Sequence, residues 1–351
     1  MDRIRLAIAG ALALLLPAFA ASAVASGLPR QAAPLFQRGV NLLGYDPYWA
    51  DPARARFRWR HFDIIRKARF DFVRVNLFAF DHLDKQGLLN PAWLDRLDAV
   101  VRHARQAELG VILDEHDFNS CSDDPAACDA RLRAVWRQLA DRYRREPDSV
   151  AFELLNEPHG KLDADRWNVL LASILKIVRQ SNPKRWVIIG PTHWNSLADL
   201  PLLRLPASDE RLLATFHYYE PFRFTHQGAA WTDNKDIHGV GWGSAQDRTR
   251  LKADFDQVAE WGKANRRPML LGEFGAYDGG STPIALRAAY TAAVAREAER
   301  RHFGWAYWQF DSDFIAWDMR RDRWVTPIRD ALIPPASQPG GAGPAESRST
   351  R

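Results

Sequence analysis

Long apolar runs are scarce in this sequence. After the first 25 residues, no segment approaches the ~20 uninterrupted apolar residues that cross a bilayer, so the mature chain is not expected to insert stably into a membrane. Long runs of one charge are also absent. The formal net charge is +5, but basic and acidic residues are interspersed, as in 144–146 and 296–301. Such runs are typical of solvated helix faces, which argues against nucleic-acid binding.

Common cofactor and metal motifs are missing as well. No Gly-x-Gly-x-x-Gly follows the first predicted strand, which argues against an open, doubly wound dinucleotide-binding sheet. Neither His-x-His nor His-Glu-x-x-His occurs, although these spacings often hold zinc. We therefore expect no cofactor and no metal. A metal-dependent hydrolase using Asp114, His116 and His217 is the alternative, and chelation would separate the two.

Cysteine occurs only twice, at Cys121 and Cys128. The six residues between them read as a loop that is able to close, and disulfides form in exported proteins. We expect the two to pair, with two free thiols as the alternative. A ring this small would add about 2.5 kcal/mol of stability in the chain-entropy description.

The N-terminus has the pattern of a secretory signal. Arg3 and Arg5 precede an apolar run over 6–20, and small Ala-x-Ala triplets follow it. A charged start, a short apolar stretch and a small-residue cleavage site predict a signal peptide at 1–25. The chain is thus expected to be exported, either periplasmic or secreted, with an uncleaved anchor as the alternative.

Tryptophan, by contrast, is abundant, with 14 copies. Its flat ring suits the face of a sugar, so the excess hints at a carbohydrate ligand. After Ile333 the composition changes to a Pro/Gly-rich and then polar stretch. This composition predicts a disordered tail at 334–351, which leaves 26–333 as the folded domain.

From residue 36 onward, short apolar segments alternate with longer amphipathic ones. Strands that alternate with helices predict parallel βα units, and eight units in roughly 300 residues fit a single closed (β/α)8 barrel, an α/β fold. The predicted strands are Arg38–Leu43, Phe72–Leu77, Gly110–Asp114, Val150–Leu155, Trp186–Ile189, Leu212–Tyr218, Met269–Glu273 and Gly304–Gln309. The predicted helices include Pro91–Gln106, Ala130–Arg144, Ala164–Arg179, Arg248–Asn265 and Pro283–His302.

Charged and aromatic residues stand where six of these strands end. Barrel enzymes build their sites at that end, and residues two apart on a strand share a face. The exits carry 74–76 (Arg-Val-Asn), 114–116 (Asp-Glu-His), 156–158 (Asn-Glu-Pro), 217–219 (His-Tyr-Tyr), Glu273 and Trp308. We expect these side chains to meet at the barrel mouth.

Two glutamates are the candidate catalytic pair. Glu157 and Glu273 end the fourth and seventh strands, across the barrel from each other, as two carboxyl groups flanking a glycosidic bond must be. Three other acids are nearby. Glu153 lies deeper on the fourth strand and is expected to pair with an internal Arg, Glu220 to be a loop acid, and Asp114 to support the site from behind.

Three short sequence segments resemble the motifs of a known protein family. The segments 152–158 (Phe-Glu-Leu-Leu-Asn-Glu-Pro), 215–221 (Thr-Phe-His-Tyr-Tyr-Glu-Pro) and 270–275 (Leu-Leu-Gly-Glu-Phe-Gly) occur in this order at barrel spacing. They closely resemble glycoside hydrolase family 5, over roughly 36–333. The stretch 222–231 resembles a subset of that family that acts on β-1,4-glucans and sometimes on mannans.

The resemblance implies a retaining β-glycosidase and assigns roles within it. Glu157 would be the acid/base and Glu273 the nucleophile, which Arg74 keeps ionised. The remaining positions would contact substrate in the −1 subsite, the position of the sugar whose bond is cleaved, or further along the cleft: His116, Asn156, His217, Tyr219, Trp308 and Trp231.

Two positions depart from the family pattern. Asp117 stands where a second histidine often follows the first, and Asn76 replaces a common proline. Both border the substrate, so they bear on polymer specificity rather than on mechanism. Four tryptophans in loops are candidates for further sugar subsites, namely Trp49, Trp194, Trp231 and Trp242. Four others are expected in the core, namely Trp93, Trp136, Trp167 and Trp261.

The sequence thus predicts a monomeric endo-β-1,4-glucanase whose partner is a β-linked polysaccharide or oligosaccharide. Alternatives with the same mechanism are action on β-mannan, on β-1,3- or mixed-linkage glucan, or on a small β-glucoside. A non-catalytic carbohydrate-binding protein is a further alternative, which absent hydrolysis would reveal.

Overall fold

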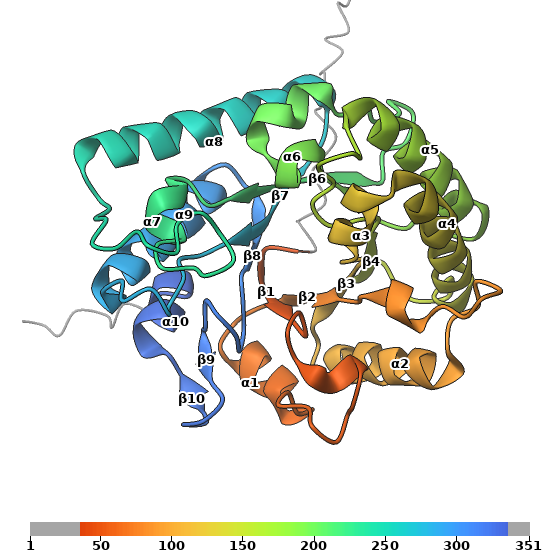
Figure 1. The fold of residues 1–351 in the computed structure, drawn as a ribbon, viewed down its shortest axis with the longest axis horizontal. Helices are drawn as coiled ribbons and strands as arrows, with labels where there is room; N and C mark the ends of the chain where they lie inside the picture. Colours follow the sequence, from red (N-terminus) through yellow and green to blue (C-terminus); the bar gives the residue numbers. More distant parts are fainter. Residues whose placement is uncertain (1–35, 336–351) are drawn as a thin grey trace, which may run out of the picture. The chain divides into compact units, whose positions relative to one another are not determined.

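Eight parallel strands close into a barrel in the computed structural model, which describes residues 36–335 (Figure 1). Each strand pairs with the next, and the first pairs with the eighth. The (β/α)8 prediction is confirmed, and all eight strands were placed correctly to within about two residues at each end. The strands are β1 Arg38–Leu42, β2 Phe72–Asn76, β3 Gly110–Asp114, β4 Val150–Glu153, β5 Val187–Ile189, β6 Leu212–Tyr218, β7 Met269–Phe274 and β8 Gly304–Tyr307.

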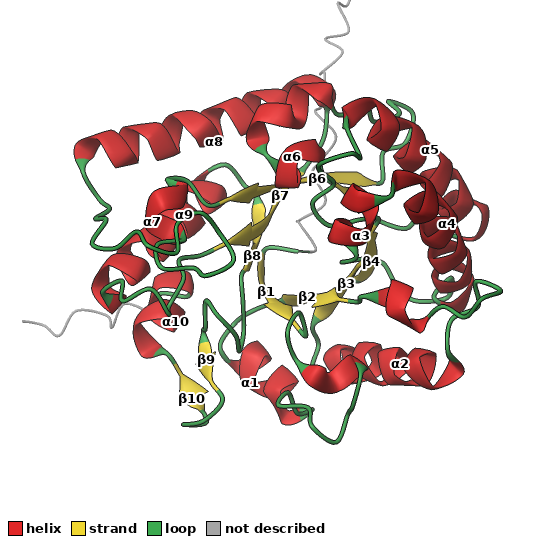
Figure 2. Ribbon diagram, in the orientation of Figure 1, coloured by secondary structure: helices red, strands yellow, loops and turns green. Residues whose placement is uncertain are grey.

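Helices surround the barrel (Figure 2). The five predicted helices are present, the second of them beginning five residues earlier than expected. Shorter ones were not predicted. The helices are α1 Arg60–Lys67, α2 Pro91–Gln106, α3 Phe118–Asp123, α4 Pro125–Arg142, α5 Ala164–Ser181, α6 Thr192–Asn195, α7 Phe222–Thr225, α8 Ala245–Asn265, α9 Ile284–Arg300 and α10 Thr326–Leu332, and a hairpin pairs β9 Trp317–Asp318 with β10 Arg323–Trp324. None of the helices between residues 36 and 335 has the length and apolarity needed to span a membrane.

The predicted signal peptide and most of the predicted tail lie outside the described residues. These are segments 1–25 and 336–351. Their roles therefore remain predictions from the sequence.

Successive side chains of each strand point alternately outward and into the barrel, which creates two separate apolar clusters. On β2, Val73 and Val75 point outward into the large cluster between strands and helices. Phe72 points inward and joins a smaller apolar cluster to which seven strands contribute. Arg74 and Asn76 share its face further along the strand. The barrel interior is therefore apolar at the start of the strands and polar at their ends, where the predicted site lies.

Local capping fixes where the long helices begin. Asn90 accepts hydrogen bonds from the backbone at the start of α2, and Pro91 occupies the first helical position. Ser244 and Asp247 form a capping box at the start of α8. Each arrangement satisfies backbone N–H groups that would otherwise lack partners. The helices thus start at positions that the sequence itself specifies.

A disulfide joins Cys121 of α3 to Cys128 in the first turns of α4. The next residue, Ser122, accepts a backbone hydrogen bond from Lys161. The Lys161 ammonium donates to the Asp123 carbonyl oxygen at 3.0 Å. The linked segment therefore contacts the loop after β4, only a few residues beyond Glu157.

Candidate active site

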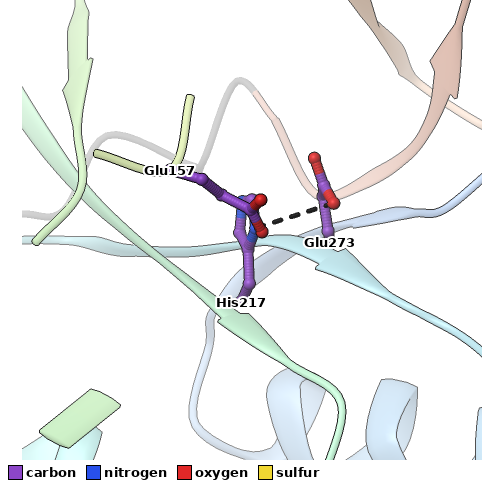
Figure 3. Close-up of side chains that lie close together, drawn as sticks. All are labelled: Glu157, His217 and Glu273. Carbon is purple, nitrogen blue, oxygen red and sulfur yellow. Dashed lines mark hydrogen bonds and ion pairs between the residues drawn. The ribbon is translucent and has the colours of Figure 1, made fainter. Parts of the chain in front are cut away.

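Glu157, His217 and Glu273 converge at the carboxyl end of the barrel (Figure 3). Glu157 lies just after β4, His217 on β6 and Glu273 on β7. One side-chain atom from each lies within 4.8 Å of the other two. His217 Nδ1 is 2.7 Å from Glu157 Oε1 and 3.6 Å from Glu273 Oε2. The imidazole ring therefore contacts both carboxyl groups.

Glu157 has a strained backbone and a perturbed carboxyl group. Its φ of 40° is in the left-handed region, which costs a non-glycine residue about 1–3 kcal/mol and often marks functional sites. Burial raises the pKa of Glu157 to about 7, although His116 and Arg74 oppose the rise. The group can therefore be protonated near neutral pH.

Each carboxylate oxygen of Glu273 accepts a hydrogen bond from a different side chain. Arg74 Nη1 donates to Oε1 at 2.8 Å, and Tyr219 Oη donates to Oε2 at 3.1 Å. Both donors direct positive charge at the carboxylate oxygens. Burial and the neighbouring Glu273 carboxylate raise the pKa of Tyr219 well above its usual value. Tyr219 therefore remains a neutral donor.

Arg74 organises the polar layer beneath these groups. All five of its N–H groups are used: two reach Glu153, and one each reaches Glu273, Asn41 and Asn156, at 2.7–2.9 Å. The predicted pairing of Glu153 with an internal arginine is present. The guanidinium is fully buried, so its position is fixed by contacts from three other strands and the loop after β4.

His116 lies beside this network. Its Nδ1 is 2.6 Å from Asp114 Oδ2. Burial alone would lower the pKa of His116, but the Asp114 carboxylate raises it above the usual value. The ring stacks on Trp308, with centroids 5.6 Å apart and planes within 6°. The two rings therefore pack against each other near the mouth of the barrel.

Asn156 has an unpaired donor beside the two candidate catalytic glutamates. Its oxygen accepts from Arg74, while its amide nitrogen is buried without a partner among residues 36–335. A buried unpaired donor is costly. A ligand hydroxyl at this position would satisfy it, in keeping with the expected contact to substrate.

Trp231 lies further out than the other predicted residues. It is 55% exposed and packs edge-on against Tyr277. Tyr277 in turn contacts Phe314, which contacts Tyr219. An aromatic path therefore leads from the nucleophile candidate to an exposed indole.

For two of the four tryptophans predicted to form sugar subsites, the prediction is wrong. Trp49 is buried, packs against Trp93 and donates to the Asn76 carbonyl oxygen. Trp242 is buried between Tyr290 and the Arg248 side chain. The loops that hold these two residues fold back onto the barrel, which their sequence did not reveal.

The other tryptophans have the exposure or burial that the sequence predicted. Trp194 is 48% exposed and stacks on the imidazole of His159, so it remains available to a ligand. Three of the four tryptophans expected in the core are fully buried, and the fourth, Trp261, is partly buried against it.

The two positions that depart from the family pattern support their neighbours. Asn76 donates to Asp114 Oδ2 at 2.8 Å, the same oxygen that His116 contacts. Asp117 accepts from the backbone N–H of Phe80 at 2.8 Å. Asp117 therefore fixes the loop after β2 rather than offering a second imidazole to a ligand.

Sequence reasoning missed Tyr45 in the loop after β1. Its ring packs edge-on against Trp308 with centroids 6.0 Å apart. Partial desolvation and the nearby charges of Asp313, Glu273 and Glu157 raise the pKa of Tyr45, although its side chain is 57% exposed. Tyr45 therefore lies at the open rim of the site, close to the candidate catalytic carboxylates. A lone tyrosine in a loop carries no sequence signal of such a role.

A second missed feature is the turn after β5. His193, Trp194 and Asn195 have φ values of 58°, 58° and 54°, a left-handed turn without glycine. Each such residue costs roughly 1–2 kcal/mol. No propensity pattern predicts three of them in succession.

The arrangement suits chemistry that uses two carboxyl groups in different states. Glu273 is bound by donors that favour its charge, whereas Glu157 is biased toward its neutral form. One group can then attack as a nucleophile while the other gives a proton. The same two residues with His217 also have a spacing that would suit a metal ion.

Comparisons with known proteins identify the family. The family model of cellulases, glycosyl hydrolase family 5, matches residues 36–313. Endoglucanase H of Acetivibrio thermocellus is 28% identical over 305 residues, which cover 84% of this chain and 32% of that protein. The chain spans between about a third and three fifths of the length of the first curated relatives that it matches.

Solved structures match over a larger share of their length. A structure of Thermotoga maritima Cel5A in complex with cellobiose has a TM-score of 0.81 and 35% identity, covering 86% of this chain and 98% of that one. Another, in complex with mannotriose, has a TM-score of 0.80 and 34% identity, covering 85% and 98%.

Proposed function

Because the chain belongs to the cellulase family, glycosyl hydrolase family 5, we propose that it is a retaining endo-β-1,4-glucanase that uses Glu157 as acid/base and Glu273 as nucleophile. The chain is a glycosyl hydrolase with endoglucanase relatives. The linkage, the mode of cleavage and the residue roles are the proposal.

One observation carries the proposal. Oxygens of Glu157 and Glu273 lie within 4.8 Å of each other. An inverting enzyme holds its carboxyl groups ~6.5–9.5 Å apart to admit a water, whereas a retaining enzyme holds them ~5–5.5 Å apart. The short separation supports direct attack by one carboxylate on the sugar.

The surrounding residues complete the proposed mechanism. Glu273, bound by Arg74 and Tyr219, attacks the anomeric carbon while Glu157 protonates the leaving oxygen. Glu157, now ionised, then removes a proton from the water that releases the sugar. The free amide N–H of Asn156 would bind the sugar 2-hydroxyl, where hydrogen bonds strengthen in the transition state.

We also propose that the enzyme acts outside the cytoplasm, because the N-terminal residues have the pattern of a secretory signal. The aromatic path from Tyr219 to Trp231 supports a polymeric substrate, since it would contact sugars beyond the cleaved bond.

The substrate is tested by reducing-sugar release from a panel of soluble polysaccharides. We expect carboxymethyl cellulose to be cleaved with a rapid fall in viscosity, because an endo enzyme cuts within chains. β-Mannan is the second candidate, because a structurally similar Cel5A is described with mannotriose as substrate. Full activity after exhaustive chelation is expected. Cleavage of β-1,3-glucan alone, or loss of activity on chelation, would contradict the proposal.

The pH dependence tests the role of Glu157. Its pKa is raised to about 7 by burial, and the first step needs the protonated form. The protonated fraction falls as the pH rises, so kcat/KM should be half-maximal near pH 7 and drop about tenfold per unit above it. The measurement is kcat/KM against pH on a cello-oligosaccharide. A flat profile up to pH 9 would contradict the assignment.

A further inference from the structure

Among residues 36–335, the side chain of Asn195 makes one polar contact, which is with His217. Asn195 ends the left-handed turn after β5 and is fully buried. Its amide nitrogen lies 3.2 Å from His217 Nε2. Its amide oxygen has no hydrogen-bond partner in the described part of the chain. The hydrogen bond to the imidazole is therefore the interaction that compensates for burying this amide.

The surrounding backbone is adapted to hold this amide. Gly190 follows β5, and a Cβ there would lie only 2.0 Å from Asn195 Oδ1. Any other residue at 190 would displace the amide. Strained turns of this kind persist where the rest of the structure determines them, and they cluster at functional sites. Gly190 and the turn thus both serve to hold the side chain of Asn195 in place.

The contact decides where His217 holds its proton. A neutral imidazole has one N–H and one acceptor nitrogen, and an amide nitrogen can only donate. Nε2 must therefore accept from Asn195, which leaves the proton on Nδ1. That proton points at Glu157 Oε1, 2.7 Å away.

His217 is neutral in this environment. Burial lowers its pKa to about 4. Four charged or titratable groups face it besides Glu157: Glu273 and Asp114 favour the imidazolium, while Arg74 and His116 oppose it. The opposing charges leave burial as the dominant influence, so the ring has a single proton to place.

We infer that Asn195 is a positioning residue that fixes the Nδ1–H tautomer of His217 and so keeps a hydrogen-bond donor directed at the acid/base glutamate. The functional consequence rests on the proposed role of Glu157. In the second step Glu157 must be ionised to act as a base, and an N–H directed at its oxygen favours the ionised form. Without Asn195 the ring could present a lone pair instead, which favours the protonated form.

The tautomer can be measured without any activity. Nitrogen-15 NMR of the full-length protein labelled at histidine distinguishes a protonated ring nitrogen from an unprotonated one, and His217→Gln identifies the signals. We expect Nδ1 protonated and Nε2 unprotonated at pH 7. In Asn195→Gly, which tolerates the left-handed backbone, both tautomers should appear. His193→Gly relaxes the same turn but retains the amide, so it should leave the His217 signals unchanged.

Kinetics then tests the consequence. In Asn195→Gly the upper limb of the pH profile should move up by roughly half to one unit, the scale of one hydrogen bond. Turnover of an activated aryl β-cellobioside should fall several-fold at pH 6, and azide, which needs no base, should restore it. A purely structural role would lower turnover without an azide response.

Two results would overturn the inference: a proton on Nε2 in the unmodified protein, or unchanged His217 signals in Asn195→Gly. If the signals behave as expected but the unmodified protein hydrolyses no β-glycoside, the proposed function fails while the tautomer assignment stands.

Discussion

Glu273→Ala is expected to abolish turnover of every substrate, natural or activated. Without the carboxylate that Arg74 and Tyr219 hold, no covalent glycosyl-enzyme can form. Loss of a nucleophile from a covalent enzyme lowers kcat by a factor on the order of 10⁵–10⁶. The measurement is release of nitrophenol from an aryl β-cellobioside, which needs little leaving-group protonation and so isolates the nucleophilic step.

Two controls separate chemistry from folding. Glu273→Gln keeps an oxygen for Arg74, so it should retain the thermal melting temperature yet remain inactive. Glu220→Ala removes an exposed acid from the loop just after Tyr219 and should retain activity. Turnover by Glu273→Ala above a few per cent of the unmodified rate would refute the nucleophile assignment.

Glu157→Ala should lose most of its activity on polysaccharide but behave differently on activated substrates. Loss of general acid/base catalysis typically costs 10²–10⁴-fold. With a good leaving group the first step still proceeds, and the glycosyl-enzyme then accumulates because no base activates water. Azide should capture this intermediate, restore turnover and yield a β-glycosyl azide, which proton NMR identifies.

The stereochemistry provides an independent check. Two successive inversions give retention, so the unmodified protein should release the β anomer first. If the α anomer appears first, the mechanism is not retaining. If azide instead rescues Glu273→Ala and gives an α-glycosyl azide, the two glutamates have exchanged roles.

The barrel could be predicted because its signal is repeated eight times. Apolar segments of four to seven residues, such as Gly110–Asp114, recur between long amphipathic helices, and each unit supports the interpretation of the next. Short helices such as α3 and α7 could not be predicted. They have six and four residues, too few to show a helical period.

The site was predictable where it depends on strand ends. Position along a strand determines which way a side chain points, so Arg74, His217 and Glu273 could be placed together from the sequence alone. Side chains in loops follow no such rule. Trp49 was therefore wrongly predicted to contact a sugar. Neither Tyr45 nor Asn195, whose position depends on backbone strain, could be predicted to lie at the site.

The five hydrogen bonds that Arg74 donates restrict which amino-acid substitutions this protein can accept. Five buried oxygens from four side chains depend on it. Arg74→Lys offers three donors, so at least two of those oxygens would lose their partners, at about 1–3 kcal/mol each. Exchanging Glu153 alone would instead leave the buried guanidinium without its bidentate partner. Because either single exchange leaves a buried polar group without a partner, Arg74 and its partners are expected to change together or not at all. An exposed side chain such as Trp194 or Trp231 can be exchanged without leaving such a group.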